Sequence, residues 1–370
     1  MARSEFAGAC EACLRRTRLL ELLAPHIERA RHQRRLPQLL ALADAELVAA
    51  IGGARRAAVA AAVEHFDAEA ARAKLRGAGL TARCRHAADY PARLLVAADA
   101  PAVLTIAGDA TLLDTLADER AIAVAIVGAR RATAYGREMA RSLGRALAGA
   151  GVPVVSGLAL GIDAAAHAGA LDAGGPTIAV LAGGADRPYP RSSASLHRRI
   201  VAGGGCVVSE MPAEFVPFKW GFPARNRTIA GLADLTVVVE AAARSGSLIT
   251  AELAQDLGRV VAAVPGPVTS PASAGANALL RDGAAVVRDA QDVLDTLLGA
   301  GVATIGSDQL AGLDPRLLAL LERVGEQATG LAPLLAASAD VDATLAALTE
   351  LELLGLVRRA PGGMYVRVPA

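Results

Sequence analysis

The sequence predicts an α/β protein with a doubly wound, mostly parallel sheet, a small helical domain before it and a winged-helix-like domain after it. Three observations support this prediction. In the middle of the chain, short β-branched runs alternate with helical patterns. Near the start, apolar residues recur at helical spacing. Near the end, a helical region leads into two short runs joined by Pro-Gly-Gly, the pattern of a hairpin.

The first 78 residues are expected to form the helical, SAM-like domain. Residues 14–30, 36–53 and 54–75 carry the helical pattern, with Gly-Gly and Pro at the breaks. Cys10 and Cys13 form a lone CxxC, and no second pair of ligand-type residues stands at metal spacing. We therefore interpret them as small residues on a helix and expect no metal site, with zinc as the less favoured alternative.

Residues 79–298 are expected to form the sheet domain, in which residues 79–113 are an extension packed on the rest. Its predicted strands are continuous apolar runs, as strands buried on both faces must be. These runs span residues 121–128, 152–157, 177–184, 206–210, 235–241 and 259–266. The alternation of such strands with helices predicts a parallel sheet.

Residues 299–313 have little pattern and are expected to be a linker. Residues 314–370 carry three helical segments and the hairpin pattern VRRAPGGMYVRV. This order suggests a winged helix, a fold that binds DNA in some proteins and other proteins elsewhere.

The charge balance restricts how this protein can bind nucleic acid. Its 38 basic and 37 acidic side chains nearly cancel over 370 residues, so such binding has to come from a local patch. No apolar run of about 18 residues is present, which predicts no membrane span. The first residues lack the order of a signal peptide, and four scattered cysteines make no disulfide framework. We expect a cytoplasmic location.

In an open parallel sheet, ligands bind beyond the carboxyl ends of the strands. After the first predicted strand come Gly128, Arg130, Arg131 and Thr133, where a dinucleotide-binding fold would place GxGxxG. One glycine and two arginines argue against an oxidoreductase. They are compatible with anion binding by side chains and by a helix N-terminus.

The second predicted strand is followed by a glycine-containing turn and a helix. Ser156 and Gly157 end the strand, and Gly161 permits the tight turn. Asp163 and His167 share a helix face, so a catalytic pair is conceivable. We favour a helix cap and a packing histidine, because no nucleophile or set of metal ligands accompanies them.

Two later strand ends add further polar groups. Ser245, Gly246 and Ser247 precede a helix and expose amide donors, although they do not form a P-loop. The stretch GFPARNRTIAG, residues 221–231, is expected to turn at Phe-Pro and form a loop. Both of its arginines can face the strand-end pocket, or one can face it while the other pairs with a carboxylate. Its asparagine can fix the loop by bonding backbone groups.

Six stretches, in order, resemble the motifs of the DNA-processing protein A (DprA, also called Smf) family. They are GARRATAYG, SGLALGIDAAAH, TIAVLAGGADRPYP, GFPARNRTIAGL, EAAARSGSLITAELA and VPGPVTSPASAGANALLRDGA. The likeness covers roughly residues 80 to 300. One departure is Thr228, which stands where the family usually has an apolar residue.

The resemblance implies an extended Rossmann-like core that binds single-stranded DNA without strong sequence preference. It implies a homodimer formed through this core, a role in natural transformation, protection of incoming strands and loading of RecA. It implies a binding protein and not an enzyme, and we expect no cofactor. The residues that the resemblance and the strand-end argument assign to phosphate binding are Gly128, Arg130, Arg131, Thr133, Ser156, Gly157, Gly161, Lys219, Arg225, Asn226, Arg227, Ser245, Gly246 and Ser247. The resemblance leaves two roles open for Phe222, contact with a base or anchoring of the turn.

Two other functions stay open. One is a Rossmann-like nucleotide phosphoribohydrolase, in which RSGSLITAE would approximate the catalytic loop and Glu252 would be the acid. The other is an adaptor whose terminal domains bind protein.

Overall fold

A computed structural model gives the arrangement of residues 9–30, 36–118, 120–300, 313–324, 329–336, 340–354, 356–360 and 362–367. The chain divides into two compact units, residues 1–288 and 289–370. Among the described residues, no helix is both long enough and apolar enough to cross a membrane. The four-part division expected from the sequence stays a prediction.

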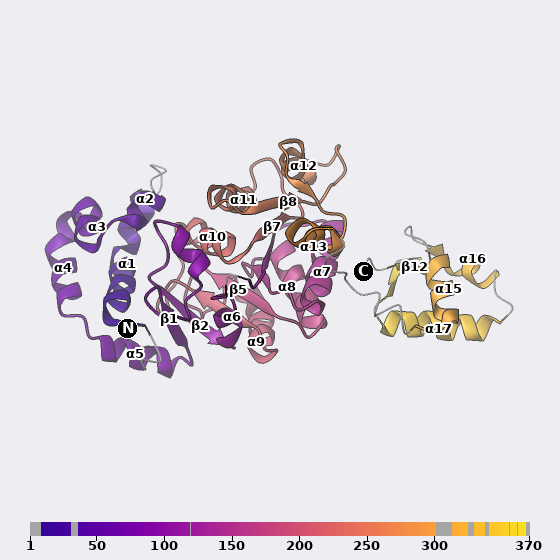
Figure 1. Ribbon diagram of the computed structural model, residues 1–370, viewed down its shortest axis with the longest axis horizontal. Coiled ribbons are helices and arrows are strands. Elements are labelled where there is room, and N and C mark those ends of the chain that lie inside the picture. Colours follow the sequence, from indigo (N-terminus) through magenta and orange to yellow (C-terminus); the bar gives the residue numbers. More distant parts are fainter. Residues whose placement is uncertain are drawn as a thin grey trace. The chain divides into compact units, whose positions relative to one another are not determined.

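The chain begins with a group of helices, drawn in indigo and violet in Figure 1. They are α1 (Glu11–Ala30), α2 (Leu36–Ala41), α3 (Asp44–Ile51), α4 (Arg56–Glu64) and α5 (Ala68–Gly77), with a short 3-10 turn between α3 and α4. Leu19, Leu23 and Ile27 of α1 are fully buried at the centre of this group. The same apolar cluster includes Phe215 and Trp220, so the helical group packs directly on the sheet domain.

A nine-stranded sheet forms the middle of the protein. Its strands are β1 (Thr81–Cys84), β2 (Val103–Gly108), β3 (Val124–Val127), β4 (Val154–Ser156), β5 (Thr177–Leu181), β6 (Cys206–Ser209), β7 (Leu235–Val238), β8 (Val260–Ala263) and β9 (Ala285–Val286). They lie in the order β1-β2-β6-β5-β4-β3-β7-β8-β9. The strands from β6 to β9 in this order run parallel, whereas β1 and β2 pair antiparallel at one edge. The predicted mostly parallel sheet is confirmed, and all six predicted strands are present.

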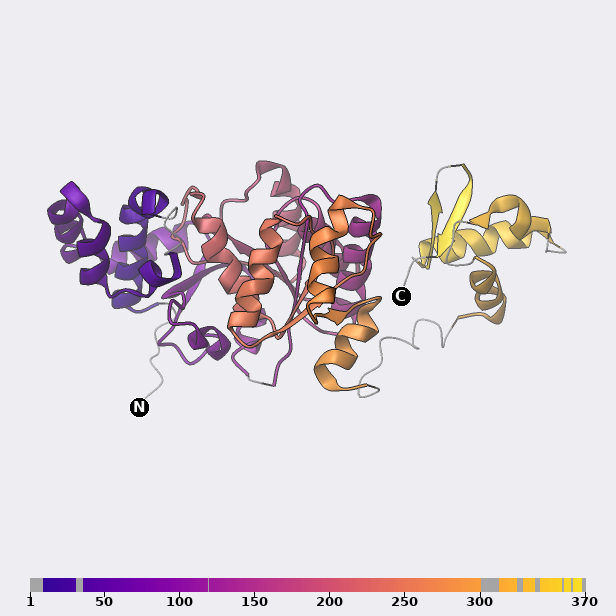
Figure 2. The ribbon, with the colours of Figure 1, turned by 90° about the horizontal axis from the view of Figure 1, so that it is seen from above.

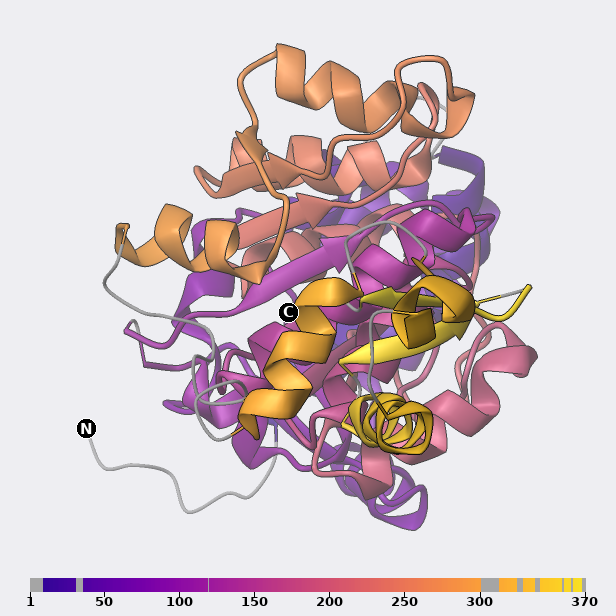
Figure 3. The same ribbon diagram turned by 90° about the vertical axis from the view of Figure 1, so that its right-hand side faces the viewer.

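Helices cover both faces of the sheet, as Figures 1 and 3 show. The helices between and around the strands are α6 (Thr111–Thr115), α7 (Ala134–Gly149), α8 (Ile162–Asp172), α9 (Ala194–Ala202), α10 (Gly221–Leu232), α11 (Gly246–Asp256) and α12 (Ala274–Arg281). Figure 2 shows α10, α11 and α12 in salmon to orange across one face. Alternate strand residues enter two separate apolar clusters, for example Val208 with Ile229 of α10, and Val207 with Ile200 of α9. This alternation explains why the strands read as unbroken apolar runs.

The strand order places a topological switch point beside β3. The chain moves outward from β3 through β4, β5 and β6, and then returns through α10 to place β7 on the other side of β3. The loops after β3 and β7 consequently diverge toward opposite faces, which opens a crevice at the carboxyl ends of these strands. Such a crevice is the usual ligand site of doubly wound folds.

The structure corrects the prediction of a loop at residues 221–231, because this stretch is helix α10. Pro223 lies in the first turn of the helix, where a missing N–H group costs no hydrogen bond. At about 100° per residue, Arg225 and Arg227 point to nearly opposite sides of the helix. Phe222, Arg225 and Asn226 lie three and four residues apart and share one side.

The second unit holds α13 (Ala290–Leu298), α15 (Pro315–Arg323), α16 (Leu331–Ala336) and α17 (Val341–Leu353). Its three-stranded sheet has the order β10-β12-β11, from β10 (Thr329–Gly330), β11 (Val357–Ala360) and β12 (Met364–Arg367). The predicted terminal hairpin is confirmed, since β11 and β12 pair antiparallel around Gly362 and Gly363, both at positive φ. The assignment as a winged helix stays a prediction, and most of the expected linker lies outside the described residues.

The structure also corrects the interpretation of Cys10 and Cys13 as an isolated pair. Cys84 and His86 lie beside them, so four ligand-type side chains meet at one place. The search for ligand pairs at metal spacing missed Cys84 and His86, because Cys84 lies 74 residues after Cys10, at the end of β1.

Candidate nucleic-acid interface

A cleft of about 530 Å³ lies at the switch point, beyond the carboxyl ends of β3 and β7. Its walls come from the β3–α7 loop, the β4–α8 loop, α10 and the N-terminus of α11. The predicted site residues that line it are Gly128, Arg130, Arg131, Phe222, Arg225, Asn226, Ser245, Gly246 and Ser247. A smaller hollow of about 130 Å³ shares Arg130, Phe222 and Arg225 with it and adds Gly157. The structure therefore brings together groups that the sequence places more than a hundred residues apart.

The loop after β3 is held against the end of β7. A Cβ at Gly128 would lie 2.8 Å from the carbonyl oxygen of Glu240, so the close approach requires glycine. The backbone N–H of Thr133 donates to the buried Glu240 carboxylate (2.8 Å). Arg130 and Arg131, at the tip of this loop, are exposed. The anchored backbone thus fixes where the two guanidinium groups emerge.

The loop after β4 is tightly folded. Leu158 and Gly161 both have positive φ, and a Cβ at Gly161 would lie 2.2 Å from the carbonyl oxygen of Ala129. The carboxylate of Asp163, in the first turn of α8, accepts from the N–H groups of Gly157 (3.1 Å) and Ala159 (3.4 Å). Burial raises the pKa of the Asp163 carboxyl, and the charge of Arg225 and these two N–H groups oppose the effect.

Arg225 is a buried cation at the floor of the cleft. Its Nη1 donates to the carbonyl oxygen of Val180 (3.0 Å), and its Nε has no hydrogen-bond partner in the described part of the chain. Burial lowers its pKa to about 10, against the attraction of Asp163, and the nearby charge of Arg130 lowers it further. At neutral pH the group is still charged. A bound anion would supply the acceptors that this guanidinium lacks.

Aromatic rings stand at one end of the cleft. The rings of Phe222 and Tyr189 are 5.5 Å apart between centroids, and the guanidinium of Arg130 lies 5.4 Å from the Phe222 centroid. The Tyr189 side chain is exposed. A cation over one face and a second ring nearby form a surface on which a planar base can stack.

The N-terminus of α11 forms the wall opposite the arginine loop. The Ser245 hydroxyl caps this helix by accepting from the N–H of Ser247 (3.4 Å), and the two hydroxyl groups lie 2.8 Å apart. Asn226 Nδ2 donates to the carbonyl oxygen of Gly246 (3.5 Å), which joins α10 to this loop. Arg244 precedes the cap, is exposed and lines the cleft. The positive end of a helix and a guanidinium therefore face the same space.

The cleft is strongly cationic. Within the residues that the structure describes, Arg130, Arg131 and Arg244 form no ion pair with a carboxylate, and Arg225 lies beneath them. Asp163 is the one acidic side chain among the lining residues. Such a surface suits a polyanion, because exposed arginines bind phosphate oxygens through two or more hydrogen bonds.

Besides Arg227, four predicted site residues lie outside the cleft. Ser156 is buried and donates to the carbonyl oxygen of Ile126 (2.6 Å), while Thr133 caps α7 through the N–H of Gly136 (3.1 Å). Gly161 shapes its loop without lining the cleft. Lys219 is exposed just before α10 and is also outside the cleft lining.

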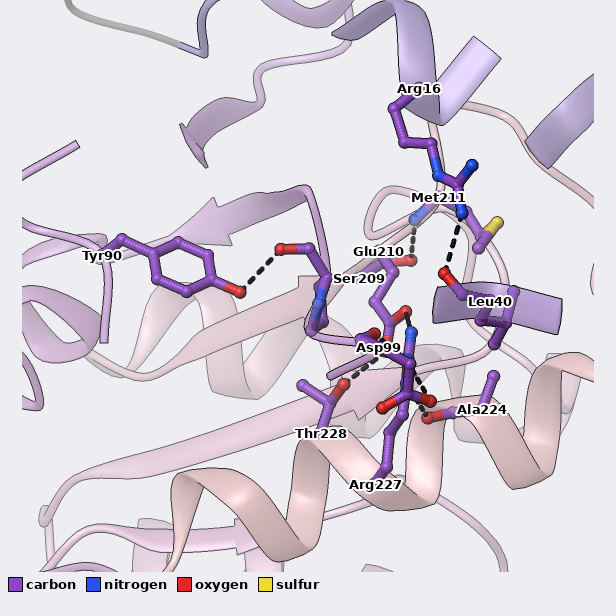
Figure 4. Close-up of polar contacts among 11 residues, drawn as sticks. Arg16, Leu40, Tyr90, Asp99, Ser209, Glu210, Met211, Ala224, Arg227 and Thr228 are labelled. Atoms are coloured by element: carbon purple, nitrogen blue, oxygen red, sulfur yellow. Dashed lines mark hydrogen bonds and ion pairs between the residues drawn. The ribbon is translucent and has the colours of Figure 1, made fainter. Parts of the chain in front are cut away.

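Arg227 requires a larger correction, because it is outside the cleft lining and lies beside Asp99 and Glu210 (Figure 4). Its guanidinium is buried and lies 2.5 Å from carboxylate oxygens of both Asp99 and Glu210. The hydroxyl of Thr228, the departure from the family pattern, donates to the same Glu210 carboxylate. Arg227 therefore neutralises buried acids and does not face the cleft. The sequence left two arrangements open for Arg225 and Arg227. In the structure, Arg225 lines the cleft and Arg227 pairs with carboxylates.

Three cleft features are absent from the predicted site residues. Arg244 and Tyr189 lie within the motif stretches, and Arg244 directly precedes Ser245 after the fifth predicted strand, but neither residue was assigned to phosphate binding. Glu240, which holds the arginine loop, gave no signal, because its partner at Thr133 is 107 residues away.

The sheet domain matches known proteins. A family model described as DNA recombination-mediator protein A matches residues 81–298. A putative DNA processing protein DprA from Mycobacterium tuberculosis is 51% identical over 205 residues, which are 55% of this chain and 50% of that protein. The chain thus spans about half the length of this relative. Protein Smf from Escherichia coli is 38% identical over 253 residues, 66% of this chain and 67% of that protein.

Two solved structures are also similar to this chain. DNA processing protein A from Streptococcus pneumoniae has a TM-score of 0.61 and 32% identity, covering 78% of this chain and 98% of that one. DNA processing protein A from Helicobacter pylori, whose single-stranded DNA binding mode was described, has a TM-score of 0.51 and 34% identity. It covers 56% of this chain and 92% of that one. Because the family model spans more than half of the chain, this protein belongs to the DNA recombination-mediator protein A family.

Proposed function

We propose that this protein binds single-stranded DNA in the switch-point cleft, through its phosphates and without strong sequence preference. The observation that carries the proposal is the convergence of four arginines, Arg130, Arg131, Arg225 and Arg244, on one cleft with a single buried acid. The single-stranded DNA binding of the Helicobacter pylori relative supports it.

The side chains suit a single strand better than a duplex. Phosphates would lie along the exposed arginines and the N-terminus of α11, and a base would stack near Phe222 and Tyr189. Base stacking needs unpaired bases, whereas a duplex hides them. The charged groups that line the cleft are mostly arginines suited to phosphates, so sequence preference is expected to be weak.

The salt dependence of binding tests this proposal. The dissociation constant for a fluorescent oligothymidine is measured by anisotropy at increasing salt, for the full chain and for Arg130→Ala/Arg244→Ala. Each lost phosphate contact on a single strand lowers the slope of log K against log salt by about 0.7, so the double variant is expected to lose roughly 1.4.

Arg281→Ala is the matched control. Arg281 is exposed and ends α12, which leads into β9, so it lies at the amino edge of the sheet, away from the cleft. Its removal takes away the same kind of charge and should leave the slope unchanged. Salt-independent affinity of the unchanged protein, or equal losses in both variants, would reject the proposal.

Membership of the family supports three more specific functions. We propose that the protein forms a homodimer through its Rossmann-like core, protects incoming strands in natural transformation and helps to load RecA in the cytoplasm. Sedimentation equilibrium tests the dimer. Nuclease digestion of a bound oligonucleotide tests protection, and RecA filament formation on a strand coated with a single-strand-binding protein tests loading. Deletion of residues 314–370 distinguishes a DNA-binding tail from an adaptor that binds a partner protein.

We also infer that the protein is not a nucleotide-processing enzyme. Glu252, the acid which that alternative requires, is exposed on α11 and outside the cleft lining. Incubation with nucleoside monophosphates should release no free base. Release of base that disappears in Glu252→Gln would favour the enzyme.

A further inference from the structure

Four ligand-type side chains meet where the first helix joins the edge of the sheet. Cys10 directly precedes α1, Cys13 lies in its first turn, Cys84 ends β1, and His86 follows two residues later. One sulfur or nitrogen atom of each lies within 4.8 Å of all the others. Nδ1 of His86 is 3.3 Å from Sγ of Cys10 and 3.4 Å from Sγ of Cys13.

These separations are close to those of a tetrahedral zinc site. With bonds of about 2.3 Å to sulfur and about 2.0 Å to nitrogen, a sulfur and a nitrogen ligand are roughly 3.5 Å apart. The ligands come as two local pairs, Cys-x-x-Cys and Cys-x-His. Structural zinc sites are commonly assembled from such pairs, and three thiolates with one imidazole are a usual ligand set.

The surroundings suit a structural metal. Cys13 and Cys84 are 2% and 3% exposed, whereas His86 lies at the surface and closes the site from outside. Four protein ligands leave no position for water, so this site would hold the fold together and not carry out catalysis. Zinc with three thiolates has a net charge of −1. Arg15 and Arg85 line the same hollow as Cys13 and His86 and supply positive charge there, whereas Arg16 is paired with Asp44.

Packing alone explains the cluster less well. A buried cysteine that acts as a small apolar residue needs no polar neighbour. Here the backbone N–H of Cys10 donates to Sγ of Cys84 (3.4 Å), a bond of the kind that orients a metal-bound thiolate.

We propose that Cys10, Cys13, Cys84 and His86 bind one structural Zn²⁺ that fastens α1 to β1. The two ligand pairs are separated by the whole helical group, so the metal closes a long loop of chain. It would hold the start of α1 on the apolar cluster that Cys13, Leu14 and Cys84 share. Loss of the metal would loosen this junction and leave the cleft residues in place.

Metal content and stability test the site in the full chain. The protein is produced without a polyhistidine tag in zinc-supplemented medium, and metals are measured by mass spectrometry. About one zinc per chain is expected. Cys84→Ser and His86→Ala should lower zinc affinity, measured by competition with a chelator, by roughly 100-fold or more, since even groups that only support metal ligands cost 10–100-fold. Because His86 is exposed, His86→Ala is expected to fold even if Cys84→Ser does not.

Cys206→Ser is the matched control, a buried cysteine outside the cluster, and should keep its zinc. Cobalt in place of zinc should give a thiolate-to-cobalt charge-transfer band in the unchanged protein and in Cys206→Ser, and a weaker one in His86→Ala. Chelation should lower the melting temperature of the unchanged protein more than that of His86→Ala. Zinc no higher in the unchanged protein than in Cys84→Ser, iron with sulfide in its place, or a Cys10–Cys13 disulfide without zinc would overturn the proposal.

Discussion

The guanidinium of Arg225 occupies the space above Gly157 where any other residue would carry a side chain. A Cβ built on Gly157 would lie 1.4 Å from Nη1 of Arg225. The glycine after β4 therefore sets the position of the buried cation on α10. This relationship joins two separate motifs into one feature of the cleft.

Gly157→Ala is accordingly expected to weaken DNA binding without removing a charge. The methyl group must displace the guanidinium from Val180 and from the cleft floor, and a charged hydrogen bond is worth about 1.5–3 kcal/mol, so affinity for oligothymidine should fall by roughly tenfold or more. Fluorescence anisotropy measures it. Gly77→Ala is the control outside the cleft, because a Cβ there meets no atom within 4 Å. Equal affinity of both variants would show that Arg225 takes no part in binding.

Arg227→Ala should act on stability and not on DNA binding. It leaves Asp99 and Glu210 with no cation in a buried position, and breaking such a pair costs about 3–5 kcal/mol. Urea denaturation at pH 7 measures the loss. Arg227→Lys keeps the charge and allows the DNA affinity of a folded variant to be compared. A smaller slope of log K against log salt, with unchanged stability, would instead show that Arg227 contacts phosphates.

Phe222→Ala is expected to reduce affinity while leaving the salt slope unchanged. Phe222 lies in the first turn of α10, with Arg130 and Tyr189 beside its ring, so it is placed for stacking and not needed to make a turn. Base stacking on an aromatic ring is worth roughly 1–3 kcal/mol. Anisotropy titrations at several salt concentrations, with Phe222→Leu to keep the apolar volume, separate the ring from simple packing. Full affinity in Phe222→Ala would leave Phe222 a purely structural role.

His167 should make the protein less stable in mild acid. Burial, and then the charge of Arg225, lower its pKa from 6.5 to about 3, and its Nδ1 lies 2.7 Å from Oγ1 of Thr177. The unfolded chain takes up this proton near pH 6.5 and the folded chain near pH 3, so stability is lost as the pH falls between these values. Between pH 6.5 and pH 5, the loss from this residue is about 2 kcal/mol.

Urea denaturation at both pH values measures the effect, with His167→Asn as the comparison. The Asn side chain can donate to Thr177 but has no proton to gain. The difference between the two pH values should therefore be smaller by about 2 kcal/mol in the variant. An identical pH dependence would show that His167 is not buried in its neutral form.

The strands predicted from the sequence and the strands that were not predicted lie in different surroundings. β3, β7 and the other four predicted strands are buried on both faces, so each is an unbroken apolar run. β1 lies at the antiparallel edge and carries Arg83, which pairs with Asp89 and Asp114, so its composition resembles a loop. β9 has only two residues. Edge position explains why β1 was missed, and shortness explains β9. β2 (Val103–Gly108) is a buried apolar strand inside the sheet, but it follows Ala100-Pro101 and lies within the stretch interpreted as an extension.

The sequence predicted the part of the cleft that is built from residues directly after the parallel strands, because ligands of such sheets bind beyond the carboxyl ends of the strands. That rule led to Gly128, Arg130 and Ser245, which line one cleft in the structure because the loops after parallel strands meet at one edge of the sheet. It failed for Arg227, whose partner Asp99 is 128 residues away, because local sequence does not show which side of a helix meets a distant acid. The same limit applies to Cys84 and His86, which become neighbours of Cys13 only when β1 is in place.

Trp220 has a consequence for any attempt to separate the sheet domain from the helices before it. Its ring is fully buried, its backbone N–H donates to Glu28 (2.9 Å), and its indole Nε1 donates to the carbonyl oxygen of Ala24 (3.1 Å). A fragment that starts at residue 79 would leave this ring and Phe215 uncovered at the start of α10. Such an apolar patch promotes aggregation. A fragment designed to keep the switch-point cleft without exposing this patch therefore has to include α1.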